Sequence, residues 1–273
     1  MPNYDKLNSE NYTEFNVKMI DKWANDETEW AYSKIITPED FAKAKKGNWS
    51  ASDYFIVPKK WFLPYIDLSH SRFDGTKILG LASGGGQQMP VLVASGADCT
   101  VMDYSDAQLM REKAVSEREG YAINIVRGDM TKRFPFDDNS FDIIYHAVAN
   151  HFIEDIHPVW EECYRVLKPG GVLIAEMMSP VCYLFDPEDD ATDLVVANKL
   201  PHNPLKDREL YEKIMSWGDD EGLEFSHSLE EQIGGQLKAG FMLTDIKESE
   251  LEGSILSNYY PEFLSTRAVK PKS

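Results

Sequence analysis

The apolar residues from position 77 onward fall into short runs separated by stretches with a helical repeat. Seven of these runs have the length and composition of β-strands, at 77–82, 99–105, 122–129, 141–148, 172–178, 241–249 and 263–269. Because strands and helical stretches alternate, we predict an α/β fold with a mostly parallel seven-stranded sheet and helices on both faces. The last two strands are joined by a loop without a helix, so the last strand is expected to run antiparallel.

The helical stretches carry recognisable ends. One helix is predicted at 87–95, and another runs to about 118 after Ser105, with Gln108 completing a capping box. An apolar stripe of Val159, Cys163 and Val166 predicts a third helix, which "KPGG" at 168–171 ends. A fourth helix is expected to place Leu229, Ile233 and Leu237 on its apolar face and to end at Gly240.

Two segments lie outside this alternation. Residues 1–76 contain four of the six tryptophans, Trp23, Trp30, Trp49 and Trp61. We expect an aromatic-rich, helical N-terminal extension that packs on the domain formed by 77–273, either as a lid over the site or as a cover for a sheet edge or helix face. Residues 179–228 form a long insertion with the acidic run "DPEDDATD", which we interpret as a solvated loop.

Composition narrows the class of protein. The formal net charge is −18, from 46 acidic and 28 basic residues, and no basic stripe is present, which disfavours nucleic acid as a partner. The start of the chain does not resemble a signal peptide, and no apolar run reaches the ~20 residues that span a bilayer, so we predict a soluble, cytoplasmic protein with no membrane partner. The three cysteines, Cys99, Cys163 and Cys182, lack metal-ligand spacing; we expect buried thiols and no metal site.

The stretch "LGLASGGGQQMP", residues 79–90, is the strongest candidate for a binding loop. It joins the first strand to the first helix, and in an open parallel sheet such loops lie where ligands bind. Asp103 ends the second strand, where a carboxylate can accept both hydroxyl hydrogens of a ribose. Asp129 follows the third strand and can accept from an adenine amino group, with Met130 packed on the ring. Together these features predict a nucleoside-containing ligand.

The common pyrophosphate motifs do not fit this loop. A dinucleotide fingerprint needs a third glycine where Met89 stands, and a P-loop needs Gly-Lys-Ser/Thr, which is absent. A nicotinamide-dependent oxidoreductase is therefore the least favoured alternative.

The chain resembles the class I S-adenosylmethionine-dependent methyltransferases. "ILGLASGGG" matches the family's first motif, "VMDYS" its ribose-binding strand, "GDM…FPFDDNSFDIIYHA" its adenine loop and fourth strand, and "ECYRVLKPGGVLIAE" its helix–turn–strand signature. "LKAGF" is similar to the family's lead into strand six, and "LASGGGQQ" resembles a bacterial subgroup. The resemblance implies a Rossmann-like sheet and S-adenosyl-L-methionine as cofactor. The cofactor-binding residues that it implies are Ala82, Ser83, Gly84, Gly85, Gly86, Gln87, Gln88, Asp103, Tyr104, Gly128, Asp129, Met130 and His146.

The first motif departs from the family at two positions. Gly80 stands where the family has an acidic residue that positions the methionine end of the cofactor, and Ala82 stands where it has glycine. We expect Gln87 and Gln88 to supply amide contacts to the methionine part instead.

Methyl transfer from a sulfonium needs a base only where the acceptor must lose a proton. The candidates follow the fourth strand and are Tyr145, His146 and His151, with Asn150 beside them and His227 as a weaker one. The favoured function is methyl transfer to a small-molecule acceptor. The alternative of another class is a non-catalytic protein that binds the nucleoside cofactor, for which Gly80 is the main support.

Overall fold

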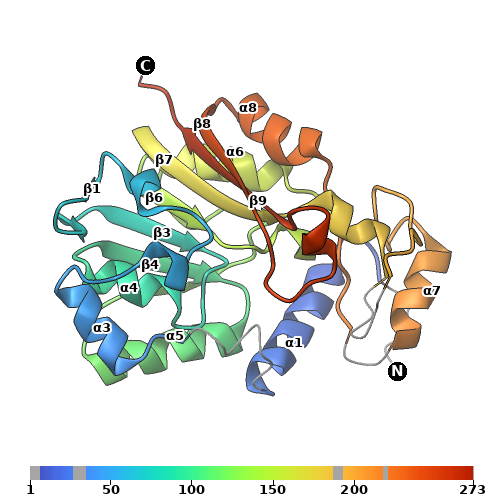
Figure 1. The fold of residues 1–273 in the computed structure, drawn as a ribbon, viewed down its shortest axis with the longest axis horizontal. Coiled ribbons are helices and arrows are strands. Elements are labelled where there is room, and N and C mark those ends of the chain that lie inside the picture. The colour runs from blue at the N-terminus through green and yellow to red at the C-terminus, as the bar shows by residue number, and fades with distance from the viewer. Residues whose placement is uncertain (1–6, 27–34, 187–192, 218–220, 273) are drawn as a thin grey trace.

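A single seven-stranded sheet organises the chain in the computed structural model, which describes residues 7–26, 35–186, 193–217 and 221–272. Its order is β5-β4-β3-β6-β7-β9-β8, and the neighbouring strands are parallel except where β9 pairs antiparallel with β7 and β8 (Figure 1). The strands are β3 (Lys77–Leu81), β4 (Asp98–Asp103), β5 (Asn124–Arg127), β6 (Phe141–His146), β7 (Leu167–Met178), β8 (Met242–Ser249) and β9 (Phe263–Val269). The predicted sheet and its antiparallel last strand are confirmed.

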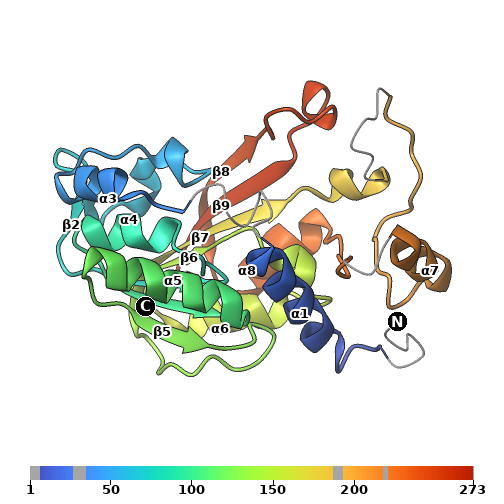
Figure 2. The ribbon, with the colours of Figure 1, turned by 90° about the horizontal axis from the view of Figure 1, so that it is seen from below.

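Helices cover both faces of this sheet (Figures 1 and 2). The α-helices of the described residues are α1 (Tyr12–Asn25), α3 (Pro38–Lys45), α4 (Gln88–Ala94), α5 (Asp106–Glu119), α6 (His157–Val166), α7 (Arg208–Trp217) and α8 (Gly235–Ala239). Of these, α7 lies apart from the sheet, in the insertion (Figure 1). Successive side chains of a strand point to opposite faces, so β6 places Ile143 in the core with α3, α4 and α5, and Ile144 in the core with α6.

The strand order reverses between β3 and β6. From β3 the chain builds outward through β4 and β5, and it then returns to the other side of β3 to form β6. The loops after β3 and β6 therefore lead away from each other at the carboxyl ends of the strands, which leaves room for a ligand between them.

The local signals at the helix ends act as predicted. Ser105 Oγ accepts a hydrogen bond from the Gln108 backbone N–H at 3.1 Å, and α6 ends at Val166, two residues before "KPGG", which the structure places at the start of β7. The Asp21 carboxylate of α1 also accepts from the Ser105 hydroxyl and the Ala107 N–H, at 2.6 and 3.0 Å. The N-terminal helix thereby caps a helix of the central domain.

The apolar face expected for the last helix is wrong at two of its three residues, since of these Ile233 packs against the core. Leu229 and Leu237 are about half exposed, at 50% and 52%, whereas Gln232 and Gln236 are buried. The chain forms a π-helical turn at Glu230–Gly234 before α8, and a Cβ on Gly235 would lie 2.6 Å from the Trp160 ring. Because glycine allows this close packing, the glutamine face turns inward and bonds to Met178 O, His227 O and Thr266 Oγ1.

The N-terminal segment packs on the domain with much of its aromatic surface. Trp49 and Trp61 are buried, Trp23 is partly buried, and Trp30 lies outside the described residues. The segment contains α1 and α3 and also a short hairpin of β1 (Ile66–Asp67) and β2 (Arg72–Phe73), which the sequence analysis did not predict. On α1, the Asn16 amide bridges Phe152 O and Leu223 O, at 2.9 and 2.8 Å.

The insertion lies at the end of the molecule opposite α3, with α7 as its helix (Figures 1 and 2). Most of its acidic run lies outside the described residues, which resume at Asp193. Within the part of the chain that the structure describes, no helix has the length and apolarity needed to cross a membrane.

Candidate functional site

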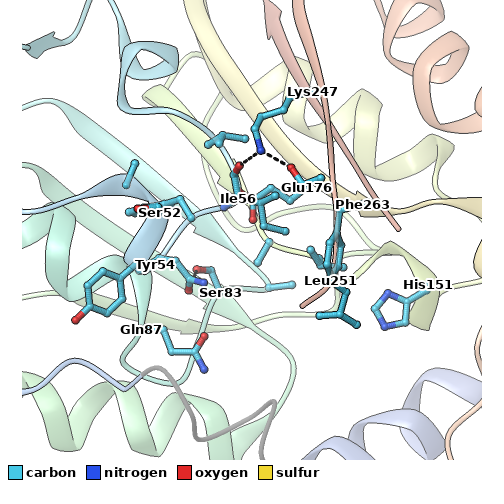
Figure 3. Close-up of a pocket in the computed structure, with 18 of the residues that line it drawn as sticks. Ser52, Tyr54, Ile56, Ser83, Gln87, His151, Glu176, Lys247, Leu251 and Phe263 are labelled. Atoms are coloured by element: carbon cyan, nitrogen blue, oxygen red, sulfur yellow. Dashed lines mark hydrogen bonds between the residues drawn. The ribbon is translucent and has the colours of Figure 1, made fainter. Parts of the chain in front are cut away.

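Two adjacent hollows lie at the carboxyl ends of the central strands. The larger is a cleft of about 1380 Å³ between the glycine loop, residues 49–59 of the N-terminal segment and residues 249–252 of the β8–β9 connection (Figure 3). The smaller is a narrow hollow of about 70 Å³ under α1. Ala82, Asp103 and Phe152 line both, so the two hollows meet at the end of β4.

Asp103 lies partly buried at this junction. One carboxylate oxygen accepts the Gly84 N–H and the other accepts the Ser105 N–H, each at 3.0 Å. Burial raises the pKa of this carboxyl, and the backbone donors of Ser105, Gly84 and Tyr104 oppose the rise. The carboxylate is thereby oriented, and because its two oxygens offer about four lone-pair sites it can still accept from a ligand.

The narrow hollow is lined by both apolar and polar residues. Tyr104, Gly128, Asp129 and Met130 line one side, as the sequence analysis placed them together. Asp129 uses one oxygen to accept from Thr131 N and Oγ1, both at 2.8 Å. The other side comes from α1, through the side chains of Thr13, Asn16, Val17 and Ile20. The N-terminal helix is thus a wall of this hollow.

The loop requires glycine at several positions largely because helix α5 packs against its backbone. A Cβ on Gly84 would lie 2.9 Å from Gln108 Cβ, and one on Gly86 would lie 2.5 Å from Val115 Cγ2. Gly85 and Gly86 also have φ of 103° and 73°, the left-handed region that favours glycine. Gly84, Ala82, Ser83, Gln87 and Gln88 line the cleft, whereas Gly85 and Gly86 line neither hollow.

The unusual Gly80 is explained by Met89. A Cβ on Gly80 would lie 2.4 Å from Met89 Sδ, and Met89 is fully buried. The methionine side chain therefore occupies the space that an acidic side chain at position 80 would need. Met89, which stands at the third glycine position of a dinucleotide motif, thus packs where the missing acidic side chain would lie. Ala82 has a φ of 48°, in the left-handed region that favours glycine.

A buried carboxyl on α5 holds the loop from below. Glu112 accepts the Gly86 N–H at 2.8 Å and the Tyr121 hydroxyl at 3.1 Å. Burial raises the pKa of Glu112 to about 7. The folded protein therefore binds the carboxyl proton of Glu112 more tightly than the unfolded chain does, in which the pKa has its usual value of 4.5.

Glu112→Gln is expected to make stability less dependent on pH. The proton on Glu112 contributes on the order of 3 kcal/mol to the free energy of unfolding. This contribution is complete below about pH 4.5 and is lost as the pH rises through 7. The difference in free energy of unfolding between variant and wild type should therefore move in favour of the variant from pH 5 to pH 8. Denaturant titrations at both pH values measure it, with exposed Glu117→Gln on the same helix as control. Parallel pH curves for Glu112→Gln and wild type would contradict the assignment.

The three predicted catalytic residues lie in different surroundings. His151, on the short helix Asn150–Phe152, lines the cleft, and its Nδ1 is buried with no hydrogen-bond partner among the described residues (Figure 3). Burial lowers the pKa of His151 to about 3, so the ring is neutral at physiological pH. His227 donates its Nε2 hydrogen to Asn150 O and Ile153 O, 3.0 and 2.9 Å away, and so supports this turn.

Tyr145 and His146 are neighbours on β6 and therefore face opposite sides of the sheet. Both are fully buried, and neither lines a hollow. His146 contacts Leu81 O and Asn150 Oδ1 at 3.2 and 2.7 Å and packs against Trp160. Tyr145 donates its hydroxyl to Glu176 at 2.7 Å. Their positions indicate support of neighbouring groups rather than direct contact with a ligand in the cleft.

Glu176 is the site residue that the sequence analysis missed. It lies on β7 in the apolar run "VLIAEMM", is 2% exposed, and lines the cleft (Figure 3). The Ile56 N–H and the Tyr145 hydroxyl donate to its two oxygens at 2.9 and 2.7 Å, and burial raises the pKa of Glu176 to about 7. A lone carboxylate at the carboxyl end of an otherwise apolar central strand was the available signal.

Comparison with known proteins agrees with this geometry. Residues 79–175 match the family model of a methyltransferase domain. The uncharacterized methyltransferase YbaJ of Bacillus subtilis (strain 168) is 42% identical over 258 residues, which is 93% of this chain and 97% of that protein. The demethylmenaquinone methyltransferase of Clavibacter sepedonicus is 33% identical over 157 residues, 55% of this chain and 62% of that protein.

The fold has solved counterparts. The crystal structure of an S-adenosylmethionine dependent methyltransferase from Mesorhizobium loti aligns with a TM-score of 0.59 and 19% identity, over 77% of this chain and 95% of that one. The chain therefore belongs to the class I S-adenosylmethionine-dependent methyltransferases, and S-adenosylmethionine is its cofactor. It is an enzyme, and the nicotinamide and non-catalytic alternatives are set aside.

Proposed function

We propose that this protein transfers the methyl group of S-adenosylmethionine to a small-molecule acceptor held in the 1380 Å³ cleft. The observation that carries the proposal is the position of Asp103, shared by the narrow hollow and the cleft. When the ribose of a nucleoside binds this carboxylate, its base can lie in the narrow hollow and its reactive end in the cleft. The acceptor then enters from the cleft.

The residues around Asp103 suit the parts of the cofactor. The ribose hydroxyls donate to the free lone pairs of Asp103. The adenine lies in the narrow hollow beside Met130, with the second oxygen of Asp129 to accept from its amino group. Gln87 and Gln88, at the start of α4, offer amides to the methionine part, and Ser83 Oγ already donates to Gln88 Oε1 at 3.4 Å. The carboxylates of the cleft favour a cationic sulfonium electrostatically.

The cofactor supplies an activated methyl group when bound, so the chain mainly positions the acceptor and excludes water. Residues 49–59 and 249–252 enclose the cleft from opposite sides. Lys247 ties these two segments together by donating to Ile56 O at 2.8 Å and to Ser249 Oγ (Figure 3). Glu176 accepts the proton of an acceptor that must lose one, and His151 offers a neutral imidazole nearby. This gives the N-terminal segment the role of a lid.

The small-molecule class is supported by the enclosed shape of the cleft and by the relatives. The protein from Clavibacter sepedonicus is named for a demethylmenaquinone substrate, which is a small molecule. Its match covers just over half of the present chain, so the acceptor itself is expected to differ.

Methyl transfer is tested with methyl-labelled S-adenosylmethionine and a bacterial cell extract, separated into a fraction below about 1 kDa and a protein fraction. We expect label in the small-molecule fraction, and none with Asp103→Ala. Label in the protein fraction alone would overturn the small-molecule acceptor. Label in neither fraction, with a folded protein that binds S-adenosylhomocysteine, would overturn catalysis on soluble metabolites.

Glu176→Gln is expected to slow labelling of the small-molecule fraction by about 100-fold, because a positioned base typically contributes at least that factor. The wild-type rate should fall as pH drops below about 7, where Glu176 becomes protonated, and the variant rate should be flat from pH 6 to 8. The control is Glu248→Gln, an exposed carboxyl on β8. Equal rates for Glu176→Gln and wild type, or the same pH profile in both, would remove Glu176 from proton transfer.

A further inference from the structure

A second cavity lies inside the insertion, next to the cleft. It has a volume of about 670 Å³ and is bounded by residues 182–186, 193–198 and 254–256 and by α7. Glu221 and Glu224 line both this cavity and the cleft, so the two spaces share a wall. The same segment is fastened to the cleft side by a hydrogen bond from Phe225 N to His151 O at 2.7 Å, and to the insertion side by one from Ser226 N to His202 O at 2.9 Å.

The polar side chains at this wall form a small cluster of Tyr183, Glu224 and His202. Tyr183 is buried and donates its hydroxyl to Glu224 Oε2 at 3.0 Å. The Tyr183 ring lies 5.2 Å from the His202 ring, centroid to centroid. Tyr183 therefore fixes the carboxylate and imidazole side by side at the boundary between cleft and cavity.

His202 carries an unused hydrogen-bonding atom. It lines the insertion cavity, its side chain is buried with 5% of the residue exposed, and its Nδ1 has no partner in the described part of the chain. A buried polar atom without a partner is costly, and it commonly marks a place where a ligand or ordered water bonds. Glu224 uses Oε2 for Tyr183, and no bond within the described residues is found for its Oε1.

The charged side chains that line the cavity are acidic, although Lys213 pairs with one of them, Asp186, at 2.6 Å. The lining includes Asp186, Asp193, Glu221, Glu224 and Glu262, and no lysine or arginine among the described residues. In the neighbouring cleft, both lysines already donate to protein oxygens: Lys59 to Trp49 O and Ser71 Oγ, and Lys247 as given above. Neither space therefore offers a free cation to an anionic ligand. Burial raises the pKa of Glu224, so its charged form is costly there unless a positive group lies beside it.

We propose that the methyl acceptor carries a cationic amino group, an ammonium or guanidinium, which Glu224 and His202 bind at the boundary of the insertion cavity while the rest of the molecule extends into the cleft. This rests on the proposed function and names the class of its substrate. The carboxylate receives charged hydrogen bonds from the cation, and His202 Nδ1 accepts one more. The apolar side chains of Phe185, Ile214 and Leu256 enclose the carbon atoms next to the charge.

Binding of three matched probes tests this. Hexylamine, hexanol and hexanoate are titrated calorimetrically into the full chain saturated with S-adenosylhomocysteine. We expect hexylamine to bind at least tenfold more tightly than hexanol, because a hydrogen bond to a charged group is worth about that factor or more, and hexanoate not to bind. Glu224→Gln should lower hexylamine affinity at least tenfold. Glu209→Gln, an exposed carboxyl in the same insertion, should leave it unchanged.

A second variant locates the probe. Ala197 lines the insertion cavity and is exposed, so Ala197→Trp narrows this cavity from its surface side with little risk to folding. Hexylamine should bind this variant at least tenfold more weakly. Unchanged hexylamine affinity in Glu224→Gln or in Ala197→Trp, or hexanoate binding as tight as hexylamine binding, would overturn the proposal. Absence of S-adenosylhomocysteine binding on the same samples would instead overturn the proposed methyl transfer.

Discussion

Asp103→Ala is expected to weaken S-adenosylhomocysteine binding by between about 100- and 1000-fold. The carboxylate is partly buried at the junction of the two hollows, and it is held by the Gly84 and Ser105 N–H groups. In the proposed binding mode its loss removes two charge-assisted hydrogen bonds to the ribose; at the low end of about 1.5–3 kcal/mol each, this already gives an effect of that size. Calorimetric titration with S-adenosylhomocysteine measures the change directly.

The control for Asp103 lies on the same strand. Asp98 is the exposed residue at the opposite end of β4, and Asp98→Ala should bind the ligand as wild type does. Because Asp103 also orients the glycine loop, Asp103→Asn provides a second variant that keeps the shape and one acceptor oxygen. Thermal melts without ligand then separate loss of folding from loss of binding. A folded Asp103→Ala protein with wild-type affinity would show that the ribose is bound elsewhere.

Gly80 and Met89 are expected to behave as one packing unit. Met89→Ala should cost about 2–5 kcal/mol in free energy of unfolding, because it empties a fully buried site. Gly80→Ala should cost about 1–3 kcal/mol, because the new Cβ would lie 2.4 Å from Met89 Sδ. The double variant should be less destabilised than the sum by 1 kcal/mol or more, since the alanine at 80 fills space that the shortened residue 89 leaves.

Denaturant unfolding of the four proteins completes this cycle. Met110→Ala on α5 is the control, because Met110 is 61% exposed and its loss should change stability by less than about 0.5 kcal/mol. Strict additivity of the two single changes would show that Met89 does not replace the missing acidic side chain. The cycle thus tests whether the departure from the family's first motif is structural.

The candidate site could be predicted in part from the sequence because its residues follow directly from strand ends. Asp103 ends β4, Asp129 follows β5, and the glycine loop follows β3, so parallel strand order alone brings them to one edge. Glu176 and Glu224 were not predicted. Each acquires its environment from distant segments, Glu176 from Ile56 and Tyr145 and Glu224 from Tyr183, and no local pattern records those contacts.

The strand β6 can also be predicted from the sequence, but which of its neighbouring candidate residues reaches the cleft cannot. The sequence placed Tyr145, His146 and His151 together as candidates, because they are close along the chain. The sheet turns Tyr145 and His146 to opposite faces and buries both, and the turn after β6 brings His151 alone into the cleft. Proximity in sequence therefore did not decide which side chain faces the ligand.

By itself, the sequence determined the sheet, its strand types, the helix ends and the acidic groups at the strand termini, because hydrophobic period and capping act over a few residues. Only the tertiary structure decided which face of the last helix is buried, why Gly80 is tolerated, and which carboxyl groups are buried. Those outcomes depend on the packing of side chains far apart in the chain, such as Gly235 on Trp160 and Met89 on Gly80. Close packing and desolvation are properties of the assembled interior, and a local pattern cannot specify them.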